Sequence, residues 1–527
     1  MTDLLTAFQM RAIEAAAIES GAVSGLELME RAGAGVVAAA FQEWPDLGRT
    51  TQRAVVLCGP GNNGGDGFVV ARLLRLAGWQ VDVFLLGDAE KLPPDARTNY
   101  DRWRALGDVT PLGDDGFDQA ASAASLVIDA LFGTGLVRPL DALPDVQIAL
   151  QRWRTAPNDV GLPKVVCVDV PSGLCSDSGV YLGGTAPEQR IAGHLTVTFH
   201  SMKCGHVLAS GPHACGKIAV CDIGLAPHPT ETSGLVARCV ETPDFKTLDK
   251  HLGHHKFSHG HALVVSGGPG QTGAARLAAR GALRIGAGLV TLGVPPSAQL
   301  EVASQITALM LTRIRDGEAL AAVLQDARIT VLCLGPGLGL NDRAENLVDL
   351  ALSDGHLSMT RRAVFDADAL SLIAQSDARM AALNTHCVLT PHGGEFARLF
   401  PDIAARLSAR PFNGPAYSKI DATRDAAVRC GAVVLFKGPD TVIAHPDGRV
   451  VVHVAAYDRA APWLATAGAG DVLAGFVAGL LARGIETFQA ANMAAWLHVE
   501  CARQFGPGLI AEDLPEALPQ VLRHLQA

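Results

Sequence analysis

The chain has 527 residues and a formal net charge of −10 at pH 7. That length exceeds the size at which one hydrophobic core usually stops growing, so we expect two domains. Apolar residues make up 49% of the chain, glycine is abundant and aromatics are scarce, which favours α/β domains and excludes a disordered chain. Because the chain is acidic and has no basic run, nucleic acid is not an expected partner, although backbone amides could still bind a small anion.

The N-terminal stretch MTDLLTAFQMRAIEAAAIES carries acids among its apolar residues and lacks the basic start of a signal peptide. The longest purely apolar run, Val472 to Ala482, is too short to span a bilayer. The eleven cysteines are odd in number and include no CxxC pair, which favours reduced thiols over a disulfide framework. We therefore expect a cytoplasmic protein without a membrane segment.

The first clear pattern in the chain is a βαβ unit. An apolar strand from Ala54 to Cys58 precedes the glycine-rich loop GPGNNGGDG, a helix that ends at Gly78 and the strand WQVDVFLL. Two further apolar runs, SLVIDALF and KVVCVDV, carry Asp129 and Asp169 at or near their ends. This pattern predicts a parallel sheet with functional loops at the ends of its strands.

A stretch rich in proline and threonine between Leu225 and Pro243 predicts a linker, with a boundary near residue 240. We therefore expect one domain over residues 1–240 and a second over residues 241–527. The second half restarts the strand, loop and helix pattern with HALVVSG, AARLAARGALRIGAG, LVTLGV, ITVLCLGPGLG, HCVLTPHGGE and AVVLFKGPD. The two halves share no repeat period, so they are interpreted as different α/β domains.

The loop after the first strand contains Gly59, Gly61 and Gly64 in the spacing of the dinucleotide fingerprint. That fingerprint also needs an acid at the end of the second strand, but Asp82 lies inside it, so an ordinary dehydrogenase is not favoured. The run from Asn62 to Gly67 mounts two amides and a carboxylate on small residues, which indicates a ligand site, with a plain turn as the alternative. Asp129 and Asp169 would lie at the ligand edge of the sheet, unless they serve only as caps or turn residues.

These motifs, together with LMERAG from Leu28, DALFGTG from Asp129 and VDVPSG from Val168, resemble the NAD(P)HX epimerase family over residues 10 to 225. The resemblance implies that Asp169 acts at the reacting ring, and proton transfer by a carboxylate fits an epimerisation. It also implies a potassium ion at Asn63, Asp129 and Ser172, whose oxygen atoms are hard ligands. The residues implied to bind the hydrated nucleotide are Asn62, Asn63, Gly64, Gly65, Asp66, Gly133, Thr134, Gly135, Leu136, Val137, Arg138, Pro139 and Asp169.

A rival metal site in this half is a short stretch with His200, Cys204, His206, His213 and Cys215. These side chains could be imagined around zinc, but their spacings fit no standard zinc pattern. Lys203, in the same stretch, would face either an anionic ligand or water.

The most informative segment of the second half runs from Ala465 to Asp471 and leads directly into the apolar helix VLAGFVAGLLARG. Small residues leave the amides at this helix start open, so that they and the helix dipole can hold a phosphate. Asp471 is placed to take a proton from a substrate hydroxyl, unless it lies there only for its interaction with the helix dipole. The chain contains no GxxxxGK[ST] motif, which disfavours a Walker-type ATPase.

The GAGD segment resembles the ribokinase-like superfamily, and the motifs GPGLG, DADAL, TPHGGE and KGPDT narrow this to the NAD(P)H-hydrate dehydratases from about residue 255 onward. Ala467 and Ala469 stand where glycine and threonine are more usual, which removes one hydroxyl from the anion hole, and the opening loop GGPGQTGAA lacks a tyrosine often seen there. The resemblance implies that the hydrate is bound by Ala274, Gly337, His392 and Asp471, and the adenine nucleotide with magnesium by Lys437, Gly438, Pro439, Asp440, Thr441 and Gly470.

The leading hypothesis is a bifunctional metabolite-repair enzyme with two three-layer αβα domains, a Rossmann-like N-terminal one and a ribokinase-like C-terminal one. The first would interconvert the (R) and (S) epimers of NAD(P)HX. The second would dehydrate (S)-NAD(P)HX with ADP or ATP, by phosphorylating the hydroxyl and losing phosphate. The alternatives are a small-molecule kinase joined to a nucleotide-binding regulatory domain, and an N-terminal half that binds partners without catalysis. We also expect a homo-oligomer.

Overall fold

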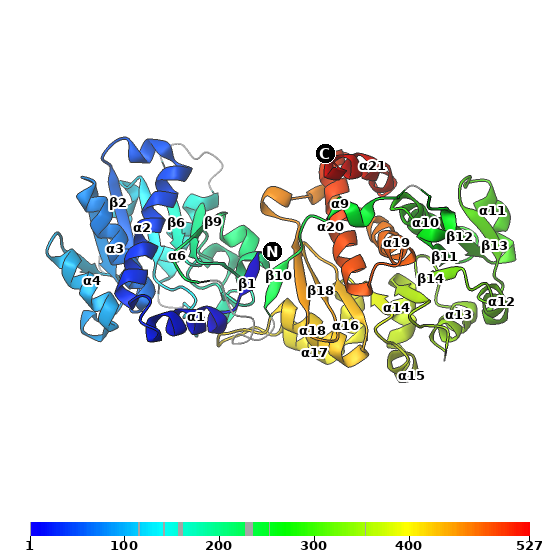
Figure 1. The fold of residues 1–527 in the computed structure, drawn as a ribbon. Coiled ribbons are helices and arrows are strands. Elements are labelled where there is room, and N and C mark those ends of the chain that lie inside the picture. The colour runs from blue at the N-terminus through cyan, green and yellow to red at the C-terminus, as the bar shows by residue number, and fades with distance from the viewer. Residues whose placement is uncertain are drawn as a thin grey trace. The chain divides into compact units, whose positions relative to one another are not determined.

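In the computed structural model the chain forms two compact units (Figure 1). The first comprises Thr2–Ala237 and Ala409–Ser418, and the second Arg238–Ser408 and Lys419–Ala527. The structure describes residues 2–113, 116–140, 143–155, 162–226, 236–251, 253–353 and 355–526. Half of the expected linker, residues 227–235, lies outside this set. The sequence did not indicate that residues 409–418 would belong to the first unit.

The first unit is built on a parallel sheet of seven strands in the order β4-β3-β2-β5-β6-β7-β9. The nearly continuous apolar runs of its central strands are typical of a sheet that is buried on both faces. The strands are β2 (Arg53–Cys58), β3 (Gln80–Leu85), β4 (Val109–Pro111), β5 (Leu126–Ala130), β6 (Lys164–Val168), β7 (Leu195–Phe199) and β9 (Lys217–Cys221). In addition, β1 (Asp3–Leu5) pairs in parallel with β8 (Met202–Lys203).

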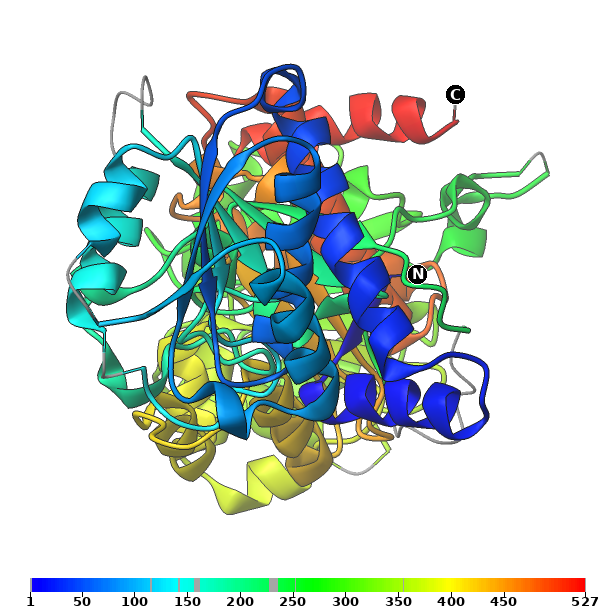
Figure 2. The same ribbon diagram turned by 90° about the vertical axis from the view of Figure 1, so that its left-hand side faces the viewer.

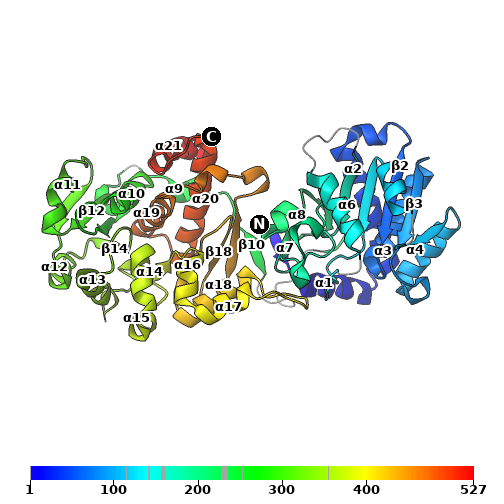
Figure 3. The same cartoon turned by 180° about the vertical axis from the view of Figure 1, so that it is seen from behind.

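Helices cover both faces of this sheet, because successive residues of each strand point to opposite sides. On β2, Ala54 and Val56 pack into one apolar core, and Val55 and Leu57 into another. Figure 2 shows the blue helices α2 and α3 along one face, and Figure 3 shows α6 on the other. The helices are α1 (Ala7–Glu19), α2 (Gly25–Glu43), α3 (Asn62–Leu76), α4 (Pro94–Arg104), α5 (Phe117–Ser122), α6 (Pro144–Thr155), α7 (Cys204–Val207) and α8 (Gly211–Ala214).

The second unit contains a mixed sheet in the order β13-β12-β11-β14-β15-β16-β17-β18-β19-β10. The pairs from β13 to β17 are parallel, whereas β18 pairs antiparallel with both β17 and β19. The strands are β10 (Ala237–Cys239), β11 (His261–Val265), β12 (Leu289–Val294), β13 (Met310–Arg313), β14 (Ile329–Leu334), β15 (Arg362–Phe365), β16 (Cys387–Leu389), β17 (Val433–Phe436), β18 (Asp440–Ala444) and β19 (Val450–Val454).

Helices again form the outer layers, with α10, α19 and α20 on one face and α13, α14 and α16 on the other (Figure 1). Both units are therefore layered α/β folds, as the sequence predicted. The helices are α9 (Phe245–Leu248), α10 (Gly273–Arg284), α11 (Gln299–Ala303), α12 (Gly317–Val323), α13 (Asp342–Leu352), α14 (Ala367–Ala374), α15 (Asp377–Ala381), α16 (Gly393–Leu399), α17 (Pro401–Ser408), α18 (Lys419–Cys430), α19 (Ala469–Ala482), α20 (Thr487–Phe505) and α21 (Asp513–Gln526).

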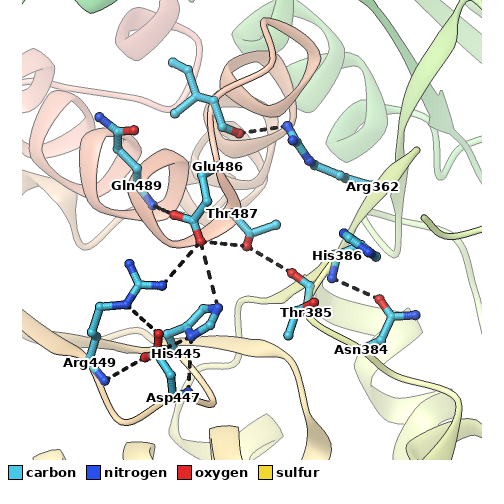
Figure 4. Close-up of polar contacts among 11 residues, drawn as sticks. Arg362, Asn384, Thr385, His386, His445, Asp447, Arg449, Glu486, Thr487 and Gln489 are labelled. Carbon is cyan, nitrogen blue, oxygen red and sulfur yellow. Dashed lines mark hydrogen bonds and ion pairs between the residues drawn. The ribbon is translucent and has the colours of Figure 1, made fainter. Parts of the chain in front are cut away.

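The start of α20 is fixed by a polar network near the amino-terminal ends of the central strands (Figure 4). Glu486 caps the helix by accepting a hydrogen bond of 2.9 Å from the backbone N–H of Gln489. Thr487 donates to the carbonyl of Thr385, which lies just before β16, over 3.0 Å. Arg449 places its guanidinium 3.7 Å from the Glu486 carboxylate. These contacts satisfy polar groups that a helix end leaves open, and they lie at the end of the strands away from the predicted site.

No helix in the described part of the chain has both the length and the apolar character needed to cross a membrane.

Candidate functional sites

The first candidate site lies at the carboxyl edge of the seven-stranded sheet. Asn62 to Asp66 form the first turn of α3, Asp129 is the next-to-last residue of β5, and Asp169 follows β6 directly. Asp169 adopts a left-handed backbone conformation with a φ of 67°, which is uncommon for a residue with a side chain. Strain of this kind persists where the surrounding structure fixes it, and it is frequent at functional positions.

The Asp169 carboxylate is held by a buried lysine. Its Oδ1 lies 2.9 Å from Lys203 Nζ and accepts a hydrogen bond of 2.9 Å from Thr198, while its Oδ2 accepts from the Thr134 amide over 3.0 Å. Lys203 is 1% exposed and also donates to the Thr198 hydroxyl. His206 fixes the same backbone, since its Nε2 lies 2.8 Å from the Asp169 carbonyl. Lys203 therefore pairs with Asp169, and the expectation that it would face a ligand or water is wrong.

The carboxyl groups of this site have their pKa values displaced in opposite directions. Burial opposes ionisation of Asp169, but the charge and hydrogen bond of Lys203 outweigh it and hold the Asp169 pKa below its usual value. Burial, and then the negative charge of Asp169, hold the pKa of Asp66 well above its usual value. The same two causes raise the pKa of Glu14, on α1. A carboxyl group shifted toward its ionised form thus lies near carboxyl groups shifted toward their neutral form, an arrangement that can divide base and acid roles.

The residues predicted to bind potassium are brought together at the same edge. Asp129 accepts hydrogen bonds from the Ser172 hydroxyl over 2.6 Å and from its backbone N–H over 2.9 Å. The backbone at Gly133 approaches so closely that a Cβ there would lie 2.7 Å from Asn63 Oδ1 and 3.0 Å from Asp169 Oδ2. The buried side-chain nitrogen of Asn63 has no partner among the described residues. Amide, hydroxyl and carboxylate oxygens therefore lie at this edge, together with the Asn63 side-chain N–H group, which has no hydrogen-bond acceptor among the described residues.

The predicted substrate loop, residues 133–139, lies beside Asp169. The Thr134 amide binds the carboxylate, Leu136 is buried, and Val137 and Arg138 are exposed. Leu136 thus anchors the loop while its tip faces outward. Asn62, the first residue of α3, is exposed, while Gly64 and Gly65 are buried in the same turn.

The alternative zinc site has no support in the described part of the chain, where no group of three or more His, Cys, Asp or Glu side chains is placed to hold a metal ion. His206, which was part of that alternative, instead accepts a hydrogen bond of 2.9 Å from the Lys203 backbone N–H at its Nδ1. Its role is to hold the loop that carries Lys203.

The second candidate site is built around the start of α19. Gly468 has a left-handed φ of 89°, which turns the chain into the helix. The Ala469 amide donates to the Thr466 carbonyl over 3.4 Å, whereas the amides of Gly470 and Asp471 have no partner among the described residues. Asp471 lies in that first turn. Burial and the negative charge of Asp366 raise the pKa of Asp471 to about 6, although the nearby Lys437 lowers it. A carboxyl group with this pKa is ionised at neutral pH and close to the range in which a general base works well.

Lys437 is the positive centre of this site. Its Nζ lies 2.7 Å from Asp366 Oδ1 and 3.7 Å from Glu395 Oε2, and Asp366 also accepts a hydrogen bond of 2.8 Å from Thr390. Burial would lower the Lys437 pKa, but these two carboxylates raise it above its usual value, so the lysine stays charged. A Cβ at Gly470 would lie 3.4 Å from Lys437 Nζ. The ammonium group therefore stands beside the open amides of α19.

Two predicted hydrate-binding residues, Ala274 and Gly337, are neighbours, since a Cβ at Gly337 would lie 3.4 Å from the Ala274 Cβ. His392 caps α16, because its Nδ1 accepts a hydrogen bond of 2.9 Å from the Gly394 amide. Its side chain is 56% exposed, and its Nε2 lies 3.4 Å from Glu395 Oε1. The histidine can therefore serve both as a cap and as a ligand contact.

The predicted nucleotide segment, residues 437–441, comprises the turn after β17 and the first two residues of β18. The Gly438 amide donates to the Thr441 hydroxyl over 3.2 Å, and that hydroxyl donates to the Gly438 carbonyl over 2.7 Å. Asp440 forms an ion pair of 2.7 Å with Lys419 Nζ, which also reaches the Lys437 carbonyl. The turn is thus held from the first residue of α18, a contact that the sequence did not indicate.

Some residues that the sequence did not assign to a site have one feature in common. Each interacts with a predicted site residue from another part of the fold. The sequence provided a partial indication, because Asp366 lies in the motif DADAL and Glu395 in the motif TPHGGE. Only the structure shows that both face Lys437. These residues are Glu14, Lys203, Asp366, Glu395 and Lys419.

Together, the fold and the two candidate sites are typical of a two-domain α/β enzyme, with buried carboxyl groups and a lysine at one site and a helix start beside a lysine at the other. Residues 25–205 match the family described as YjeF-related protein N-terminus, and residues 262–520 match the family described as NAD(P)H-hydrate dehydratase. These matches cover both candidate sites.

Curated proteins give full-length matches. The bifunctional NAD(P)H-hydrate repair enzyme Nnr of Moorella thermoacetica is 35% identical over 99% of this chain and 97% of its own length, and that of Coxiella burnetii is 33% identical over 98% of both. The NAD(P)H-hydrate epimerase of Rhodobacter capsulatus is 49% identical over 39% of this chain and 92% of its own. The chain belongs to the family of bifunctional NAD(P)H-hydrate repair enzymes.

Among solved structures, an ADP/ATP-dependent NAD(P)H-hydrate dehydratase from Bacillus subtilis, co-crystallised with ATP and Mg²⁺, is 26% identical with a TM-score of 0.42, over 53% of this chain and 94% of its own. The bifunctional repair activity predicted from the sequence, NAD(P)HX epimerisation and ADP/ATP-dependent dehydration, is confirmed by the family.

Replacing Lys203 with methionine should strongly destabilise the first unit, because it leaves the Asp169 carboxylate buried without its partner. We expect the free energy of unfolding at pH 7 to fall by about 3–5 kcal/mol, as for other broken buried pairs. The deficit should shrink toward low pH, where Asp169 takes up a proton. Chemical denaturation at several pH values measures both effects.

The matched control is Lys217→Met, which removes a 65% exposed lysine paired with Glu43 in the same unit. An exposed pair contributes about 0–1 kcal/mol, so this variant should unfold almost like the parent. Equal losses in the two variants would contradict the importance of the buried pair.

Proposed function

We propose that epimerisation takes place at Asp169 in the first unit and dehydration at Asp471 in the second. The observation that carries the first assignment is the opposite displacement of the Asp169 and Asp66 pKa values at one sheet edge. Pairs of carboxyl groups held in different protonation states are the usual means by which a site provides a base and an acid at the same pH.

In the first unit, Asp169 is ionised at neutral pH and can take a proton from the hydrated ring and return it. Lys203 and Thr198 hold Oδ1 and the Thr134 amide holds Oδ2, so the carboxylate cannot rotate. Asp66, whose raised pKa favours its neutral form, can donate a hydrogen bond to a substrate oxygen. The first turn of α3 and the loop of residues 133–139 then bind the nucleotide part, as the family resemblance implies.

A potassium ion fits the edge next to Asp169. Asn63, Asp129 and Ser172 offer oxygen atoms, which suit a hard cation, and no thiol or imidazole is among them. The ion would supply positive charge that fixes the substrate loop against the sheet. The unpaired Asn63 side-chain nitrogen remains available for a substrate acceptor.

In the second unit, Asp471 takes the proton of the hydrate's hydroxyl, and that oxygen attacks the terminal phosphoryl group of ADP or ATP. The bond to the leaving nucleotide breaks, and the amides at 468–470 with Lys437 stabilise the transferred charge. The bond between the ring carbon and the phosphorylated oxygen then breaks, and phosphate leaves with the electron pair. A proton is lost from the neighbouring ring carbon, which restores the dihydropyridine. The turn of residues 437–441 would hold the nucleotide, and magnesium would neutralise its phosphates.

Replacing Asp169 with asparagine removes the proposed base but keeps its shape. We expect the exchange of (R)- and (S)-NADHX to slow by at least about 100-fold, the usual contribution of a positioned base. Dehydration of pure (S)-NADHX with ADP should stay near the parental rate, because that reaction uses the other unit. Chromatographic separation of the epimers measures the exchange.

Asp118→Asn, a substitution in the first turn of α5 and outside both sites, is the control and should leave exchange unchanged. Undiminished exchange in Asp169→Asn would show that the first unit binds the nucleotide without using this carboxylate.

The dehydration rate should rise with pH through about 6 and level off above it, because Asp471 acts only when ionised and its pKa is about 6. Above that pH, Asp471→Asn should lose at least about 100-fold of the rate, and the rate that remains should lack this rise with pH. The measurement is the return of dihydronicotinamide absorbance from (S)-NADHX and ADP. A stable phosphorylated product in place of NADH would instead identify the second unit as a small-molecule kinase.

Removal of potassium should slow epimerisation and leave unfolding of the second unit unaffected. We expect exchange to fall when tetramethylammonium replaces potassium at equal ionic strength, and to recover on adding potassium back. In Asp129→Asn, which weakens the proposed ligand set, the recovery should need more potassium. Exchange that is equally fast in both salts would contradict the ion site.

A further inference from the structure

Residues 409–418 come from the second half of the sequence but belong to the first unit. They form an irregular segment, here called the strap, between α17 and α18. The strap carries no helix or strand, so its position depends on what it contacts. Those contacts are the two loops that form the epimerase site.

One set of contacts joins the strap to the predicted substrate loop. The Gly414 amide donates a hydrogen bond of 3.0 Å to the carbonyl of Val137. The two backbones lie so close that a Cβ at Gly414 would meet the Leu136 carbonyl oxygen at 2.6 Å. Only a residue without a side chain can occupy this place without moving the loop.

A second set joins the strap to the loop that follows Asp169. The Ala416 amide donates to Cys175 Sγ over 3.3 Å, and the Gly183 amide donates to the Pro411 carbonyl over 2.8 Å. The side chains of Leu136, Cys175, Leu182 and Ala416 form a small apolar core of their own. The strap therefore connects the two loops on which the reacting groups are mounted.

The strap is connected to the proposed catalytic carboxylate, Asp169, through the substrate loop. Leu136 and Val137, which the strap holds, lie two and three residues beyond Thr134, whose amide binds Asp169 Oδ2. Gly133, one residue earlier, packs against Asn63 and Asp169. A displacement of the loop at residues 136–137 is thus passed directly to the groups that hold substrate and base.

We propose that the strap is a positioning segment of the epimerase site, with Gly414 setting the distance at which the substrate loop lies from Asp169. This inference rests on the proposed role of residues 133–139 as the substrate loop. It means that the second half of the chain supplies part of the geometry of a reaction carried out in the first unit. The strap itself takes no part in proton transfer.

The test is Gly414→Ala in the full-length protein, which adds one carbon against the Leu136 carbonyl. We expect KM for (R)-NADHX in epimerisation to rise by about tenfold while kcat changes little, because loop position governs binding more than proton transfer. Hydrogen exchange of the peptide covering residues 132–140 should become faster. Dehydration of (S)-NADHX with ADP should be unchanged, which shows that the second unit is intact, and the retained kcat of epimerisation shows that the first unit is folded.

Gly414→Val extends the series and should raise KM further. Asn413→Ala changes the neighbouring exposed side chain, which makes none of these contacts, and should behave as the parent. An unchanged KM and unchanged exchange of residues 132–140 in Gly414→Ala would overturn the inference. If Asp169→Asn still abolishes exchange in that case, only the role of the strap is wrong; if it does not, the site assignment itself fails.

Discussion

Each unit buries a carboxylate against a lysine at the carboxyl edge of its sheet, and the rest of each site is arranged around that pair. In the first unit Lys203 holds Asp169 at 2.9 Å, and in the second Lys437 holds Asp366 at 2.7 Å. A charge buried without a partner is costly, so each lysine is as necessary to the fold as to the chemistry. The two pairs differ in whether the paired carboxylate is itself the proposed catalytic base.

In the first unit the paired carboxylate is itself the proposed base. Lys203 favours the ionised form of Asp169, and the negative charge that results helps to raise the pKa of Asp66. In the second unit the proposed base is the carboxylate outside the pair, Asp471, whose pKa is raised by burial and by Asp366. The same elementary constraint thus yields a strongly ionised base in one site and a base poised near pH 6 in the other.

The anion hole shows how a site can depend on the backbone more than on side chains. Ala467 and Ala469 supply no hydroxyl at the start of α19, but the left-handed turn at Gly468 still opens the amides of the first helical turn. Ala469 is buried in the apolar core of the second unit, where a polar side chain would need a partner. Phosphate binding here would rest on amides, the helix dipole and Lys437.

The sequence by itself determined the α/β class, the order of strands and loops, and the family, because apolar periodicity and glycine-rich motifs are local properties of the chain. It also determined which carboxylates end the strands, since Asp129 and Asp169 can be located from the runs that precede them. Only the tertiary structure decided which cation faces which carboxylate. Lys203 is 34 residues from Asp169 in the sequence and Lys437 is 71 from Asp366, and no local pattern records such pairings. The strap shows the same limit most clearly, since nothing in residues 409–418 indicates which unit they join. Two hydrogen bonds between backbone groups, one from a backbone amide to Cys175 Sγ and one small apolar core decide it.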